Sequence, residues 1–141
     1  MPDINVLVYA HKEEALEHRD FAAWLTKLSE SDQAFALSDI VLSGFLRIVT
    51  HPQIYDPPSS VEVALAFVEE LRSRPNCLII ETGTRHWHIF TKLCRQVNAR
   101  GNAIPDAYLA ALVIESGSEL ATADRGFARY PGLRWRHPIA P

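Results

Sequence analysis

The chain has 141 residues, of which 48% are hydrophobic, and its formal net charge is −3. This length and composition fit one domain with a buried core, so we expect a single domain over residues 1–141. The acidic balance argues against nucleic-acid binding through overall positive potential and restricts any such contact to a local basic strip. Cys77 and Cys94 lack Cys-x-x-Cys spacing, and the sequence shows neither an apolar leader nor an apolar run of roughly 20 residues. We therefore expect a reduced, cytoplasmic protein without a membrane segment.

The first half of the chain alternates short apolar runs with helical patterns. Residues 4–10 are apolar except for Asn5, and the pattern alone fits either a buried strand or a buried helical turn. Apolar residues recur every three or four positions over 18–29, which predicts an amphipathic helix. A strand is expected at 34–37, and Ser38 is a suitable N-cap for a helix over 39–50.

The second half continues the alternation. Ser59 or Ser60 is expected to cap a helix that ends before Pro75. The remaining expected elements are a strand at 77–80, a helix at 85–97 capped by Thr84 with Trp87, Phe90 and Leu93 inward, a helix from Pro105 to Gly117, and strands at 120–122 and 133–135. Alternating strands and helices predict an α/β fold with a mainly parallel sheet between helical layers.

Three aspartates, Asp3, Asp106 and Asp124, lie where one expected element gives way to the next. Taken singly, each has an ordinary structural explanation, such as the helix dipole for Asp106 or a turn for Asp124. Asn5 favours a site, because a polar residue in an apolar segment needs a partner, either a carboxylate or a metal-bound water. Gathered carboxylates repel one another, and a bound magnesium ion would relieve that repulsion. Such a site can hydrolyse phosphodiesters.

Other chemistries are less well supported. His86, His88 and Cys94 lie on one expected helix and raise zinc as an alternative, but the two histidines point to different faces. The sequence contains no Gly-x-Ser-x-Gly elbow and no Gly-rich phosphate loop. A serine hydrolase and a nucleotide-binding loop are therefore disfavoured.

Basic and aromatic residues crowd the segment around and after Asp124. The arginines are Arg125, Arg129, Arg134 and Arg136. They fit a phosphate-binding strip or an ordinary solvated surface equally well. Tyr130 and Trp135 either stack on bases or belong to the core.

Three motifs, Asp3-x-Asn5-Val6-Leu7, Pro105-Asp106-Ala107-x-Leu109-Ala110-Ala111 and Thr122-Ala123-Asp124-Arg125-Gly126-Phe127, occur in this order over essentially the whole chain. Together they resemble PIN-domain ribonucleases, specifically VapC-type toxins of bacterial toxin-antitoxin pairs. The resemblance implies a three-layer α/β/α sandwich, acidic residues that bind magnesium, with manganese as the alternative ion, and RNA cleavage. It also implies a VapB-like antitoxin partner and a homodimer.

Carried over by position, the resemblance makes Asp3, Asp106 and Asp124 the catalytic and metal-binding residues. Asn5 and Thr122 would support these carboxylates, and the basic strip makes Arg125 and Arg129 the candidate RNA contacts. The resemblance also implies that Asp3 ends the first strand and that residues 6–10 form a helical turn. Only two residues precede Asp3, so that strand is short or the true start lies upstream.

The chain departs from the family at one position. The family usually has a glutamate in the helix after its second strand, and this sequence has Gly44 there. Asp39, five residues earlier on the expected helix, lies roughly 140° around the axis and does not simply replace it. This departure motivates an alternative, a catalytically impaired PIN domain that binds RNA or an antitoxin. A haloacid-dehalogenase-like phosphatase is a third hypothesis, but that family needs an aspartate where Asn5 stands.

Overall fold

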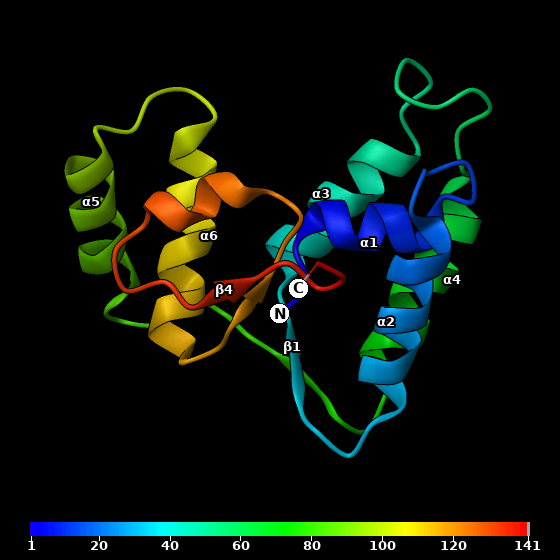
Figure 1. Cartoon of the computed structure of the whole chain (residues 1–141), viewed down its shortest axis with the longest axis horizontal. Helices are drawn as coiled ribbons and strands as arrows, with labels where there is room; N and C mark the ends of the chain where they lie inside the picture. Colours follow the sequence, from blue (N-terminus) through cyan, green and yellow to red (C-terminus); the bar gives the residue numbers. More distant parts are fainter. Residues whose placement is uncertain (141) are drawn as a thin grey trace.

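The computed structural model describes residues 1–140. Strands lie in the middle, with α5 and α6 on one side and α1 to α4 on the other, so the architecture is the expected α/β arrangement of three layers (Figure 1). In chain order the elements are α1 (Ile4–His11), α2 (His18–Glu30), β1 (Phe35–Leu37), α3 (Asp39–Val49), α4 (Val61–Arg72), β2 (Cys77–Ile79), α5 (His86–Val97), α6 (Ala103–Ser116), β3 (Leu120–Ala121), the 3-10 helix η1 (Arg125–Arg129) and β4 (Trp135–Arg136). None of the helices formed by residues 1–140 combines the length and apolar character needed to cross a bilayer.

The strand pairs of the described residues are parallel, which confirms the prediction from strand and helix alternation. β1 pairs with β2 and β3 pairs with β4, while Pro2 forms a parallel bridge to Ala121. The Asp3 N–H donates to the Ala121 carbonyl at 2.8 Å, so the start of the chain runs beside β3. Parallel strands need crossover connections, and the pair of helices α3 and α4 supplies the one between β1 and β2.

The ambiguous apolar run at 4–10 is a helix, as the family resemblance implies. Asp3 has extended backbone angles and is the N-cap of α1, because its Oδ1 accepts a hydrogen bond from the Ile4 N–H at 2.7 Å. Most of α1 is buried, which explains why its sequence shows no polar face. The chain therefore turns from extended backbone to helix at Asp3, although only a single bridge at Pro2, not a full strand, precedes it.

The expected serine caps of α3 and α4 are confirmed, whereas the expected cap of α5 is wrong. Ser38 accepts a hydrogen bond from the Val41 N–H at 3.4 Å, and Ser60 accepts one from the Val63 N–H at 3.2 Å. Thr84 does not cap α5; the N-cap is Arg85, which makes no side-chain capping bond. In place of a local cap, the Glu115 carboxylate of α6 accepts hydrogen bonds from the N–H groups of Gly83 (2.6 Å) and Arg85 (2.9 Å).

The inward face of α5 also differs from the prediction. Trp87 is 68% exposed, whereas His86 is 3% exposed and donates from Nε2 to the Tyr108 carbonyl at 2.9 Å. Positions 86, 90 and 93 follow the four-then-three spacing of one helical face, and residue 87 lies about 100° around the axis from residue 86. The helix therefore packs on α6 through His86, Phe90 and Leu93.

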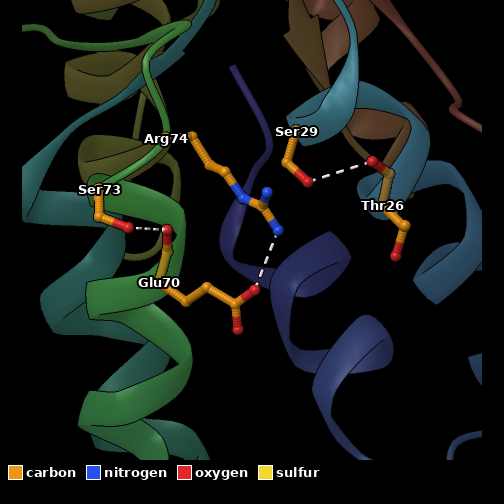
Figure 2. Close-up of polar contacts among 5 residues, drawn as sticks. All are labelled: Thr26, Ser29, Glu70, Ser73 and Arg74. Carbon is orange, nitrogen blue, oxygen red and sulfur yellow. Dashed lines mark hydrogen bonds and ion pairs between the residues drawn. The ribbon is translucent and has the colours of Figure 1, made fainter.

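The turn after α4 is tied to the end of α2. Arg74 extends from the end of α4 toward Ser29 of α2, with a guanidinium nitrogen 3.0 Å from Glu70 (Figure 2). The hydroxyls of Ser73 and Ser29 donate to the carbonyls of Glu70 and Thr26, at 2.8 and 3.1 Å. Each of these bonds is local, because it joins residues three or four positions apart at the end of one helix.

Asn76 makes the central contact at this junction. Its Nδ2 lies 3.2, 2.9 and 2.8 Å from the carbonyl oxygens of Leu28, Ser31 and Gln33. One amide group therefore joins the end of α2 to the residue before β2. Nothing in the periodicity of the sequence indicates this contact.

We expect Asn76→Asp to lower the free energy of unfolding by about 2–4 kcal/mol, because it replaces a donor with a carboxylate that faces three carbonyl oxygens. Urea unfolding at pH 7 measures the change. Asn102→Asp is the matched control: Asn102 is the exposed N-cap of α6, where a carboxylate is favoured, so its change should stay within about 0.5 kcal/mol. Equal stability of the two variants would contradict the role given to Asn76.

Candidate active site

Asp3 is a buried carboxylate that the surrounding chain holds in place. It is 6% exposed, at the point where the extended segment that bridges to β3 turns into α1. Oδ1 accepts from the Ile4 N–H at 2.7 Å, and Oδ2 accepts from the Thr122 hydroxyl at 2.7 Å and from Asn5 Nδ2 at 3.2 Å. Three donors therefore fix the orientation of this carboxylate.

Thr122 and Asn5 connect Asp3 to the turn that carries Asp124. Thr122 is fully buried directly after β3, and its Oγ1 accepts from Asn5 Nδ2 at 3.2 Å and from the Asp124 N–H at 3.0 Å. Asn5 Oδ1 accepts from the Ala123 N–H at 3.1 Å. The partner that Asn5 needs in its apolar segment is thus the Asp3 carboxylate with the Thr122 hydroxyl.

Asp106 and Asp124 line the same pocket as Asp3. Asp106 lies in the first turn of α6, and Asp124 is the N-cap of η1, where its Oδ1 accepts from the Gly126 N–H at 2.8 Å. The pocket has a volume of about 390 Å³. Its lining residues are Asp3, Ile4, Asn5, Val8, Tyr9, Ile48, Tyr55, Asp106, Asp124 and Phe127. The structure therefore brings together the three aspartates that the sequence singled out.

The carboxylates influence one another electrostatically. Burial raises the pKa of Asp3, and the charge of Asp124 raises it further, while the hydrogen bonds from Thr122 and Ile4 act in the opposite direction. Burial also raises the pKa of Asp106; Asp124 and then Asp3 add to this, and Arg129 opposes it. Keeping these groups ionised costs free energy in the protein alone, and a bound cation would offset that cost.

The donor set fits a hard divalent cation. Every polar side chain that lines the pocket carries an oxygen atom that can bind a cation. These oxygens belong to carboxylates, an amide and tyrosine hydroxyls. Within residues 1–140, no three Asp, Glu, His or Cys side chains are grouped closely enough to hold one ion together. Magnesium usually takes one or two carboxylates and keeps several waters, so a looser arrangement of carboxylates suits it.

The histidines considered for zinc do not belong to this pocket. His86 is buried between α5 and α6 and is bonded to the Tyr108 carbonyl, whereas His88 is exposed on α5. The two side chains therefore lie on different faces of the helix, as their spacing predicts.

An apolar side chain fills the place of the expected fourth acid. A Cβ atom on Gly44 of α3 would lie 2.4 Å from Cδ1 and 3.1 Å from Cγ1 of Ile4, which itself lines the carboxylate pocket. Asp39 cannot take the role, because it is exposed and pairs with Arg72 at 2.5 Å. Ile4 and Gly44 are thus complementary, and the site has three acids.

The arginines after Asp124 do not form one strip. Arg129 lies near the pocket, since its charge acts on Asp106, and its Nε donates to the Gly126 carbonyl at 3.0 Å. Arg125 is exposed beside it on η1. Arg134 and Arg136 are engaged elsewhere: Arg134 donates to the Gly117 carbonyl, and Arg136 pairs with Glu119 at 2.8 Å.

The aromatic residues of the pocket are not those that the sequence suggested. Tyr130 is 2% exposed and donates to the Ala103 carbonyl at 3.0 Å, so it belongs to the core. Tyr9 and Tyr55 line the pocket instead. Tyr55 lies in the proline-bounded loop between α3 and α4, where no periodic pattern indicates which residues face inward. Tyr9 lies one helical turn after Asn5 in α1, and this spacing was the only feature of the sequence that could have placed it at the pocket.

Comparisons with a family model and with known proteins indicate the same family. The PIN domain model matches residues 1–133. VapC ribonuclease Mb2897 of Mycobacterium bovis is 43% identical over 137 residues, which cover 97% of this chain and 93% of the relative. Ribonuclease VapC25 of Mycobacterium tuberculosis is 36% identical over 136 residues, or 96% of each chain.

The fold has a counterpart among solved structures. The crystal structure of VapBC2 from Rickettsia felis, bound to a DNA fragment from their promoter, contains a chain that matches with a TM-score of 0.71 at 21% identity, covering 96% of both chains. At this identity the match shows the shared fold. From the family model and the two relatives, the chain belongs to the PIN domain family and, within it, to the VapC ribonucleases.

Proposed function

We propose that this protein is a magnesium-dependent endoribonuclease, the toxin of a VapBC-type pair, and that it cleaves RNA phosphodiester bonds. One observation carries the proposal: Asp3, Asp106 and Asp124, from three separate parts of the chain, line one pocket. The names of the VapC relatives, which are ribonucleases, support the reaction class.

The metal would be held by Asp3 and Asp106, with Asp124 completing the site through the ion or its waters. When bound, the ion would orient the phosphate, lower the pKa of the attacking water and stabilise the leaving oxygen. Asn5 and Thr122 keep Oδ2 of Asp3 in a fixed orientation. Arg129 and Arg125 would contact the RNA backbone near the pocket. Manganese is the alternative ion.

We also propose a VapB-like antitoxin as partner, a homodimer and a cytoplasmic location. The solved chain of similar fold comes from a complex named VapBC2, which supports the antitoxin. Exposed apolar side chains on β2 and α4, Leu78, Val61 and Val63, offer surface that a partner could bury. The thiols of Cys77 and Cys94 are free, which suits a reducing compartment.

Metal removal tests the proposed activity. Purified protein incubated with single-stranded RNA should cut it in magnesium, lose the activity in excess EDTA, and regain it when magnesium or manganese is added back. A gel of labelled RNA reads out the cleavage. Unchanged cutting in EDTA would contradict the metal requirement.

The same assay separates the alternatives. A protein that binds RNA yet never cuts it at any magnesium concentration would be the catalytically impaired PIN domain that Gly44 motivates.

A further inference from the structure

Two tyrosines contribute to the carboxylate pocket from different parts of the chain. Tyr9 lies on α1, and Tyr55 lies in the loop between α3 and α4. Both line the same pocket as Asp3, Asp106 and Asp124, together with the apolar side chains of Val8, Ile48 and Phe127. The pocket therefore has anionic groups and an aromatic, apolar wall.

The Tyr9 ring packs against the hydrophobic core. α1 is otherwise buried over residues 6–8 and at Ala10, but Tyr9 is 36% exposed. Its ring packs against Phe21 of α2, with centroids 5.1 Å apart and planes tilted by 55°. Tyr9 thus contacts the core through its ring, stays partly exposed and lines the pocket.

A buried cation fixes the Tyr55 ring. Lys12 Nζ lies 4.4 Å from the ring centroid, and the Lys12 side chain is 7% exposed, with Glu14 at 3.7 Å. A desolvated cation over an aromatic face is a favourable contact. The backbone adds to this, since the Tyr55 N–H donates to the His51 carbonyl at 3.0 Å. The ring is therefore held in position before any ligand binds, which lowers the entropic cost of binding.

We propose that Tyr9 and Tyr55 bind an unpaired nucleobase of the RNA strand while the adjoining phosphate lies at the carboxylates. This inference rests on the proposed ribonuclease function and identifies two residues that bind the RNA substrate. A nucleotide joins an anionic phosphate to a flat aromatic base. The pocket contains the carboxylates that would hold the proposed ion and, beside them, two tyrosines and apolar side chains. Single-stranded RNA is commonly recognised by bases stacked on aromatic side chains, and such stacking tolerates any base.

Binding without cleavage tests the inference. In an Asp106→Asn background with magnesium present, fluorescence anisotropy would measure the Kd of a fluorescein-labelled, single-stranded oligoribonucleotide of mixed sequence. Tyr55→Leu and Tyr9→Leu, made separately, should each weaken binding roughly 5- to 100-fold. Tyr55→Phe keeps the ring and should bind within about twofold of its parent. Trp87→Ala, which removes a 68% exposed aromatic from α5 outside the pocket, is the matched control and should not change the Kd.

An abasic oligomer of the same length adds an independent readout. If the tyrosines contact a base, Tyr55→Leu should not weaken binding of the abasic oligomer further. An equal loss on both oligomers would overturn the inference, as would unchanged RNA binding by Tyr55→Leu, or a loss in Tyr55→Phe as large as in Tyr55→Leu. Circular dichroism would show whether each variant is folded. If Tyr9→Leu does not fold, the binding of the mixed-sequence and abasic oligomers by Tyr55→Leu tests the inference.

The two proposals fail in different ways. If the unsubstituted protein never cuts RNA but its binding depends on the Tyr55 ring, the catalytic proposal fails and the base-binding wall stands. If it cuts RNA and the leucine variants bind and cut equally well, only the base-binding wall fails.

Discussion

Asp106→Asn is expected to lower RNA cleavage by at least about a hundredfold while the protein stays folded. Even substitutions of residues that only support metal ligands cost 10- to 100-fold in metal affinity or activity, so removing a ligand's charge should cost at least that much. Asparagine keeps the size of the side chain at this half-buried position in the first turn of α6. Single-turnover cleavage in magnesium measures the effect.

The free energy of unfolding should depend less on pH in Asp106→Asn than in the parent. The pKa of Asp106 is raised in the folded protein by burial and by Asp124 and Asp3. Its stabilising contribution is therefore complete below the unfolded pKa of about 4 and is lost as the pH rises through the raised pKa. In EDTA, the free energy of unfolding of the Asn variant should fall less between acid and neutral pH than that of the parent. Urea titrations over this pH range give the comparison.

A matched carboxylate outside the pocket is the control. Asp32 is exposed in the turn after α2, and Asp32→Asn should cleave RNA at the parent rate. Full cleavage by Asp106→Asn would rule out the assignment of Asp106 to the metal site. A loss of cleavage that coincides with unfolding of Asp106→Asn would contradict the expectation that the carboxylate is not required for folding.

Gly44→Glu is expected to lower the free energy of unfolding by about 1–3 kcal/mol in metal-free protein, the usual cost of overpacking. The new side chain would have to displace Ile4, whose Cδ1 would lie 2.4 Å from the added Cβ. It would also bring a fourth carboxylate toward a pocket in which the pKa values of Asp3 and Asp106 are already raised. Urea unfolding in EDTA measures the loss.

Two companion variants separate the steric cost from the charge. Gly44→Ala should stay within about 1 kcal/mol of the parent, because the better helix propensity of alanine offsets a small shift of the Ile4 side-chain tip. In a double-mutant cycle, Ile4→Ala combined with Gly44→Glu should lose less stability than the two single changes added together. Strict additivity would contradict the contact between the two side chains.

The order of elements could be predicted from local features of the sequence. Helical spacing of apolar residues gave α2, and Ser38 and Ser60 gave the starts of α3 and α4, because capping needs only a hydroxyl a few residues from the free N–H groups. The order of the three aspartate motifs likewise led to the pocket that the structure forms. The helical spacing and the caps act over short distances along the chain, whereas the three motifs were connected only by the family resemblance.

The sequence by itself thus determined the α/β class, the helix starts with serine caps, and the three acids that the resemblance assigns to the site. Tertiary packing alone decided that Glu115 replaces Thr84 at the start of α5, that Ile4 takes the place left by Gly44, and that Tyr9 and Tyr55 share a pocket. Each of these contacts joins residues about 30 or more positions apart. No local spacing encodes which long-range neighbour a side chain meets, because that depends on how the layers pack.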